Sequence, residues 1–202
     1  MDVKILSMTN TNGHTMKEYI GHLAGICYGK DDYSSNRCES CYRAGHTGVL
    51  EHVSISFFVD GISRVSANQL VRHRMASYLQ ESQRYVKYEF DENMFVIPPT
   101  IDKHNIDSFM LSCKADMNAY HDLIERGTKP EDARYLLPNA MKTKIVVTNN
   151  FRSLFHFFDL RLGYRAQWEI RRLAEMMFDE LQKVEPDIAN MYMKYRDATK
   201  ID

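Results

Sequence analysis

The densest group of side chains that could bind an anion lies between residues 69 and 85, in the run QLVRHRMASYLQESQRY. Arg72 and Arg74 stand two residues apart, so on a helix their guanidinium groups would diverge by about 200° and reach two ligands, or two parts of one. The segment after them has no helical pattern but carries amide, hydroxyl and guanidinium groups, at Gln80, Ser82, Gln83 and Arg84. Guanidinium groups bind phosphate through paired hydrogen bonds, and amides can recognise the edge of a pyrimidine. The run therefore indicates an anion site; the plainer alternative is a surface helix with scattered charges.

The charge distribution also favours a local anion site. Lys and Arg number 26 and Asp and Glu 27, for a formal net charge of −1. Residues 72–87 nevertheless hold four basic side chains and one acidic one, and residues 142–172 hold seven and two. Two basic clusters in an otherwise acidic chain indicate a confined site, whereas non-specific binding of a polyanion needs a basic surplus that this chain lacks.

The cysteines suggest a different chemistry. Cys38 and Cys41 form a CxxC pair, which can bind zinc or act in redox reactions. A structural zinc site needs about four ligands at paired spacings. No second pair follows, and His46 and His52 are poor substitutes. We therefore expect no metal site and reduced thiols, and keep a CxxC protein as an alternative.

Interleaved basic and aromatic residues between Arg72 and Tyr88 raise a further alternative, a protein that binds single-stranded nucleic acid. Such a protein would be colourless and would bind oligonucleotides in a salt-sensitive way.

The elements that must position these residues include both strands and helices. Alternating apolar residues predict a strand at 49–60, and shorter β-rich runs predict strands at 84–90 and 144–148. Ser63 resembles an N-cap for a helix running toward Arg74. Helical spacing and stop signals predict further helices at 105–127, at 128–138 (short, begun by a capping box from Thr128 to Glu131), at 151–162 and at 166–184.

Length and composition complete the expected architecture. The 202 residues are 44% hydrophobic and 26% charged, which excludes a disordered chain. We expect a single domain, residues 1–202, of the α/β (α+β) class, with a central mixed β-sheet flanked by helices. Residues 1–19 lack the features of a signal peptide, and no apolar run is long enough to cross a bilayer. We therefore expect a cytoplasmic protein with no membrane and no nucleic-acid partner.

Five segments, in order, resemble those of the flavin-dependent thymidylate synthases. Arg72-His73-Arg74, followed after seven residues by Ser82-Gln83-Arg84-Tyr85, resembles the signature of that family. The others are the segments GHTGVLEH at 45–52, ARYLLP at 133–138, and NFRSL with HFF, LR and RAQWEI between 150 and 170. Together they span roughly residues 45–172. The chain has no GxGxxG or P-loop motif, so it is no Rossmann flavoprotein.

The resemblance implies a reaction and its ligands. Members of this family transfer a one-carbon unit from methylenetetrahydrofolate to dUMP and reduce it with hydride from reduced FAD, giving dTMP and tetrahydrofolate. NADPH usually re-reduces the flavin. The family works as a homotetramer with shared active sites, and it uses no cysteine nucleophile.

The resemblance also assigns roles to residues. Those implied to bind FAD are Ser54 (from a neighbouring subunit), Arg72, His73, Arg74, Gln80, Asn150, Arg152 and His156, with His52 lining the site. Those implied to bind dUMP are Gln69, Leu70, Val71, Arg72, Gln80, Glu81, Ser82, Gln83, Arg84, Arg134 and Arg161.

Arg161 is implied to be catalytic, at the uracil ring. An arginine stays protonated and cannot act as a base, but it can stabilise the charge that develops on an ionised ring. Gln80, Gln83 and His156 stand where relatives often have glutamate, glycine and asparagine.

Overall fold

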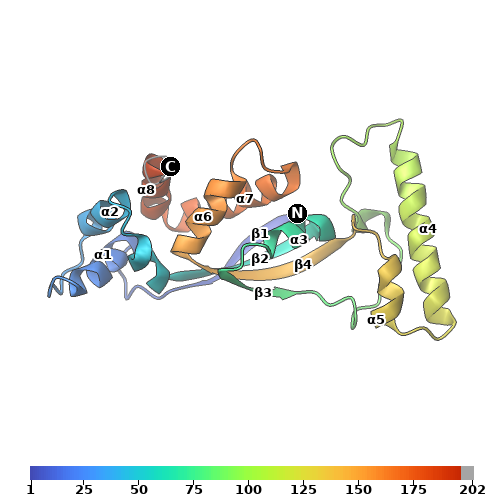
Figure 1. Cartoon of the computed structure of the whole chain (residues 1–202), viewed down its shortest axis with the longest axis horizontal. Helices are drawn as coiled ribbons and strands as arrows, with labels where there is room; N and C mark the ends of the chain where they lie inside the picture. The colour runs from blue at the N-terminus through green and yellow to red at the C-terminus, as the bar shows by residue number, and fades with distance from the viewer. Residues whose placement is uncertain (197–202) are drawn as a thin grey trace. The chain divides into compact units, whose positions relative to one another are not determined.

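The computed structural model describes residues 1–196, and its β-structure is one four-stranded antiparallel sheet (Figure 1). In spatial order the strands are β1 (Asp2–Met8), β2 (Ser54–Ser63), β4 (Lys142–Asn150) and β3 (Ala76–Gln80). The α+β class is therefore confirmed.

The prediction of a mixed sheet was wrong. Neighbouring strands of the sheet run in opposite directions, so the sheet is antiparallel. The pairing of β2 with β4 illustrates this. At one end Phe151 N–H donates to the Val53 carbonyl, and at the other Arg64 N–H donates to the Met141 carbonyl, both at 3.0 Å.

The helices connect and flank these strands. They are α1 (Met16–Ile26), α2 (Ser35–Arg43), α3 (Arg64–Leu70), α4 (Ile106–Glu125), α5 (Pro130–Ala133), α6 (Phe151–Arg161), α7 (Trp168–Val184) and α8 (Pro186–Tyr195). Short 3-10 turns are η1 (Thr47–His52), η2 (Glu92–Met94) and η3 (Arg134–Leu136).

The chain forms two compact units. Unit 1 holds residues 1–2, 59–70 and 79–145, and unit 2 holds residues 3–58, 71–78 and 146–196 of the described chain. Unit 1 contains α4, whose Cys113, Met117 and Tyr120 pack with Phe95 and Met141 in a buried cluster. Cys113 is accordingly buried, at 4% exposure.

The core of unit 2 is built around aromatic side chains of α6. The Phe155 ring lies 4.7 Å from that of Tyr192 in α8, and the Phe158 ring lies 5.6 Å from that of Phe178 in α7. Each fully buried side chain of this size contributes about 1.5–3 kcal/mol of transfer free energy. This packing fixes the rotation of α6, so the side of the helix opposite the phenylalanines is available for a site.

Several predicted elements are confirmed. The three long helices correspond to α4, α6 and α7, and the strand expected at 144–148 corresponds to β4. The expected Ser63 cap is present, because the Ser63 Oγ accepts a hydrogen bond from Ser66 N–H at 3.1 Å. The helix that it caps, α3, ends at Leu70, before the arginines.

Other predictions were wrong, for tertiary reasons. Residues 84–90 are not a strand, since Tyr88 and Phe90 pack against the unit 1 core; the strand in this region is β3. The capping box is also absent: α5 begins at Pro130, and the carboxylate of Glu131 pairs with Arg84 Nε at 2.6 Å.

The first strand and three helices, β1, α1, α2 and α8, were not predicted. The start of α1 carried a readable signal, a capping box in which Thr15 and Glu18 exchange hydrogen bonds.

Candidate functional site

The junction between β4 and α6 positions one wall of the site in unit 2. Asn150 ends the strand and caps the helix, where its Oδ1 accepts a hydrogen bond from Ser153 N–H at 2.8 Å. Arg152 and His156 stand four residues apart on α6 and therefore project from the same side of it. Both are exposed, while the phenylalanines of the opposite side are buried. The N-terminal end of the helix favours an anion, because its backbone N–H groups and dipole point outward there.

A cavity of about 690 Å³ lies along this side of α6. Its lining residues are Glu51, Arg72, His73, Arg74, Met75, Asn150, Arg152, Ser153, His156, Leu160 and Arg161. The cavity lining thus contains four arginines and two histidines but only one carboxylate, that of Glu51. A volume of this size is typical of sites for cofactors and small molecules, and the charge balance favours an anionic ligand.

Two contacts fix arginines in the cavity wall. Arg152 forms an ion pair with Glu51, which lies in η1. Arg161, the last residue of α6, donates from Nε to His73 Nε2 at 3.0 Å. An unprotonated Nε2 is required for that bond, since an imidazolium nitrogen can only donate.

The electrostatics of His73 agree with this protonation state. Burial first, and then the nearby Arg161 and His156, together lower the pKa of its imidazole from 6.5 to about 4. Both effects disfavour a second positive charge beside the guanidinium. His73 is therefore neutral at physiological pH.

A second group of predicted residues lies in unit 1, around Glu131. Arg84 pairs with the Glu131 carboxylate, and Arg134 Nε donates to the Glu131 carbonyl at 3.0 Å. Both arginines are exposed, so their remaining N–H groups can reach a ligand. Glu131 therefore contacts both arginines that were predicted to bind nucleotide, Arg84 and Arg134. The sequence had indicated only a helix-capping role for Glu131.

Three other residues implied to bind nucleotide make contacts within the same unit. Gln80 Nε2 lies 3.5 Å from Thr143 Oγ1, and the Ser82 Oγ accepts a hydrogen bond from Arg84 N–H at 3.2 Å. Gln83 Nε2 lies 3.9 Å from Met141 Sδ.

Glu81 is held differently. Its carboxylate accepts a hydrogen bond from the Tyr88 hydroxyl at 2.9 Å, and burial together with this bond raises the pKa of Tyr88 to about 12. Gln69 is half-buried in α3, Leu70 is buried at its end, and Val71 lies in the turn that follows.

The structure brings together seven of the residues predicted from the resemblance, on the cavity in unit 2: Arg72, His73, Arg74, Asn150, Arg152, His156 and Arg161. His52 and Ser54 are exposed and do not line this cavity. Ser54 instead bonds through its backbone N–H to Thr9 Oγ1 at 2.9 Å.

Four further lining residues, Glu51, Met75, Ser153 and Leu160, were not predicted to have a role. Glu51, Ser153 and Leu160 all lie within the recognised segments. Met75 carried no signal beyond its place after the arginines.

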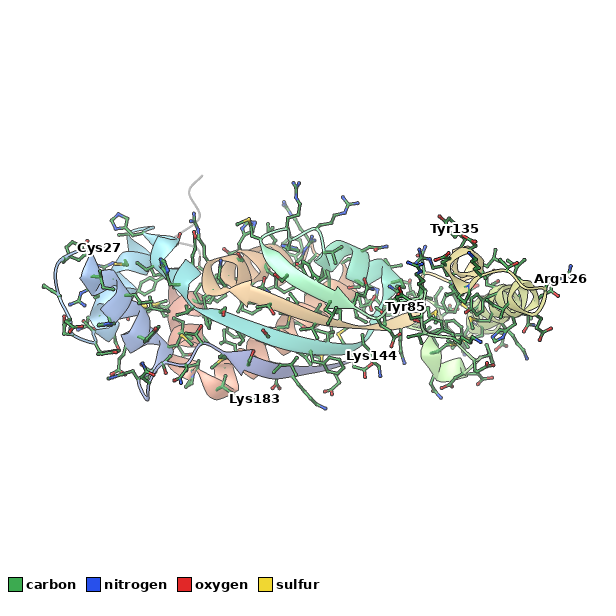
Figure 2. The ribbon with its side chains drawn as sticks, turned by 90° about the horizontal axis from the view of Figure 1, so that it is seen from below. Cys27, Tyr85, Arg126, Tyr135, Lys144 and Lys183 are labelled. Atoms are coloured by element: carbon green, nitrogen blue, oxygen red, sulfur yellow. The ribbon has the colours of Figure 1, made fainter. Side chains whose placement is uncertain are left out.

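The CxxC alternative finds no support in the geometry. Cys38 is fully buried, and that burial raises the pKa of its thiol to about 12, which suppresses the reactive thiolate. Burial also raises the pKa of Cys41. Cys27 is exposed at the end of α1, where Figure 2 labels it. Within residues 1–196 no cluster of three or more His, Cys, Asp or Glu side chains is placed to hold a metal ion.

In the described part of the chain, no helix combines the length and apolar character needed to cross a membrane.

Comparison with known families decides the relationship. The family model of the thymidylate synthase complementing protein matches residues 8–187. The chain belongs to this family. Members named flavin-dependent thymidylate synthase include that of Saccharolobus solfataricus, which is 40% identical over 194 residues, covering 92% of this chain and 74% of the relative.

Other relatives are more similar over a shorter region. The flavin-dependent thymidylate synthase of Pyrococcus horikoshii is 51% identical over 143 residues, and that of Pyrococcus furiosus is 48% identical over 143 residues. Each alignment covers 69% of this chain and 59% of the relative. The chain thus spans less than two thirds of the length of these relatives.

Proposed function

We propose that this chain is an FAD-dependent thymidylate synthase that converts dUMP to dTMP, with methylenetetrahydrofolate as the one-carbon donor and NADPH as reductant. The observation that carries the proposal is the cavity in unit 2. Residues from the Arg-His-Arg segment and from the 150–161 segment, far apart in sequence, line one space of suitable size and charge. Membership of a family whose named relatives are flavin-dependent supports the same conclusion.

The residues of the cavity fit a flavin dinucleotide. Its pyrophosphate is anionic, and Arg72, Arg74 and Arg152 provide guanidinium groups for it, with the N-terminal end of α6 beside them. The neutral imidazole of His73 offers a flat surface rather than a competing charge. When bound and reduced, the flavin supplies the hydride; the chain supplies alignment and charge.

The proposed dUMP contacts fall mainly in unit 1. Arg84 and Arg134 would bind the phosphate, because both are exposed and share Glu131 as an anchor. Gln69, Gln80, Ser82 and Gln83 would bind the sugar or base through amide and hydroxyl groups. Leu70 and Glu81 would contribute through backbone groups, since one is buried and the other is engaged by Tyr88.

Arg161 would activate the uracil ring. Methylation requires electron density on the ring carbon, and a fixed guanidinium stabilises the negative charge that builds up on the ring oxygens. Because Arg161 keeps its proton throughout the useful pH range, its contribution is electrostatic rather than basic.

We further propose that the whole chain works as one functional domain in a cytoplasmic homotetramer. The exposure of His52 and Ser54, away from the cavity of their own chain, is consistent with a contribution to the cavity of a neighbouring copy. The four cysteines are free thiols, as expected in a reducing compartment.

The test combines cofactor uptake with turnover. Purified protein should take up FAD, turn yellow, and release tritium from ring-labelled dUMP when methylenetetrahydrofolate and NADPH are added. Arg161→Ala should keep FAD but lose tritium release, and light scattering should give the mass of a tetramer. A colourless protein that binds single-stranded oligonucleotides in a salt-sensitive way, without tritium release, would refute the proposal.

A further inference from the structure

Arg161, the last residue of α6, has one anchor for its guanidinium group among the described residues. Arg161 Nε donates to His73 Nε2 at 3.0 Å, and within residues 1–196 no other hydrogen bond or ion pair to this guanidinium is present. An unanchored arginine side chain loses much of its rotamer freedom when a ligand fixes it. A single well-placed acceptor removes part of that cost before the ligand arrives.

The acceptor is itself held from two directions. The Tyr78 hydroxyl donates to the backbone carbonyl of His73 at 2.7 Å. The imidazole meets the Phe157 ring edge-on, with centroids 5.0 Å apart and planes at 84°. Phe157 is 1% exposed and belongs to the packed side of α6. The position of Nε2 is thus tied to the core of unit 2.

The chemistry of the pair defines which atoms remain for a ligand. Neutral imidazole offers one acceptor nitrogen, and Arg161 spends its Nε–H on it. The two terminal amino groups of the guanidinium are left over, and they are the donors that bind a planar oxyanion. Arg161 lies on the cavity wall together with His73, so these donors belong to the same space.

We infer that His73 is a positioning residue, which holds the Arg161 guanidinium through Nε so that its terminal amino groups face the uracil oxygens in the transition state. This inference rests on the proposed function and extends it, since it gives His73 a role beyond contact with the cofactor. A positioned donor contributes to catalysis only if it need not reorganise when charge develops.

Two substitutions distinguish the effect of losing the hydrogen-bond acceptor at position 73 from the effect of losing the imidazole ring. His73→Gln places an amide oxygen at about the depth of Nε2, and His73→Met has similar length but offers no comparable acceptor. Both remove the imidazole, so any loss of stacking on the cofactor is common to the two variants. The difference between them reports the hydrogen bond to Arg161.

The kinetic readout is the division between kcat and KM for dUMP. We expect His73→Met to have a kcat about tenfold to a hundredfold below that of His73→Gln. FAD affinity should be the same in the two variants, and KM should change little. Equal kcat values would overturn the inference, as would a difference confined to KM.

A second measurement is independent of activity and of folding of the His73 variants. In 15N-labelled wild-type protein without flavin, the His73 Nε2 resonance should be that of an unprotonated nitrogen at pH 7, and Arg161→Lys should shift it. A protonated Nε2, or no response to Arg161→Lys, would overturn the inference. If the wild type releases no tritium but the resonances behave as expected, the proposed function fails while the His73–Arg161 contact stands.

Discussion

Replacing His73 with Gln should make the folding stability of the protein less sensitive to acid. In the folded chain the pKa of this imidazole is lowered from 6.5 to about 4, first by burial and then by Arg161 and His156. The unfolded chain therefore takes up a proton at this position at a higher pH than the folded chain does. The stability contribution of neutral His73 is complete above about pH 7 and is lost progressively as the pH falls from about 6.5 toward 4.

The shift sets the magnitude. About 2.5 pKa units at 1.36 kcal/mol per unit give an upper limit of about 3.4 kcal/mol. Because His73 is only half-buried, solvent screening reduces this, and we expect about 1–2 kcal/mol. Urea unfolding at pH 7.5 and pH 4.5 measures this contribution. Between these pH values the free energy of unfolding should fall by about 1–2 kcal/mol more in the wild type than in His73→Gln. Contributions that the rest of the chain makes equally to both proteins cancel in this comparison. Equal losses in the two proteins would refute the reasoning.

Other predictions concern the core, a helix cap and the thiols. Met117→Ala, in the fully buried cluster of unit 1, should lower the free energy of unfolding by about 2–5 kcal/mol, and a loss below 1 kcal/mol in urea unfolding would contradict that packing. Asn150→Ala should cost about 1 kcal/mol in the same assay because it removes the bond to Ser153 N–H, whereas Asn150→Asp should retain most of the stability. A maleimide reagent should label Cys27 first and Cys38 last, read by peptide mass spectrometry; rapid labelling of Cys38 in folded protein would contradict its burial and raised pKa.

Local patterns predicted those elements whose stabilising contacts lie within the element. The periodicity of α4, α6 and α7 reflects one buried side of each helix, and the alternation in β2 reflects one buried face. Residues 84–90 have high β-propensity, but Tyr88 gains more from packing and from its bond to Glu81 than from a strand.

The candidate site could be predicted only in part. The segment motifs pointed to seven residues that share one cavity, because the resemblance carries information about tertiary structure that spacing alone lacks. The partners of those residues were not predicted. Glu51 forms an ion pair with Arg152, about a hundred residues away in sequence, and Glu131 forms one with Arg84, nearly fifty residues away. Pairings over such separations depend on how the strands between them are arranged.

The two ends of α6 have one further consequence. Arg152 stands in its first turn and Arg161 at its last residue, so nine helical steps of 1.5 Å separate them by about 13.5 Å along the axis. Substitutions on the outer side of the helix leave that spacing intact. Deleting or inserting one residue would change it by about 1.5 Å and rotate one group by about 100° relative to the other. The length of this helix is therefore under a stricter constraint than its composition, and natural variation in α6 should consist of exchanges of residues without gaps.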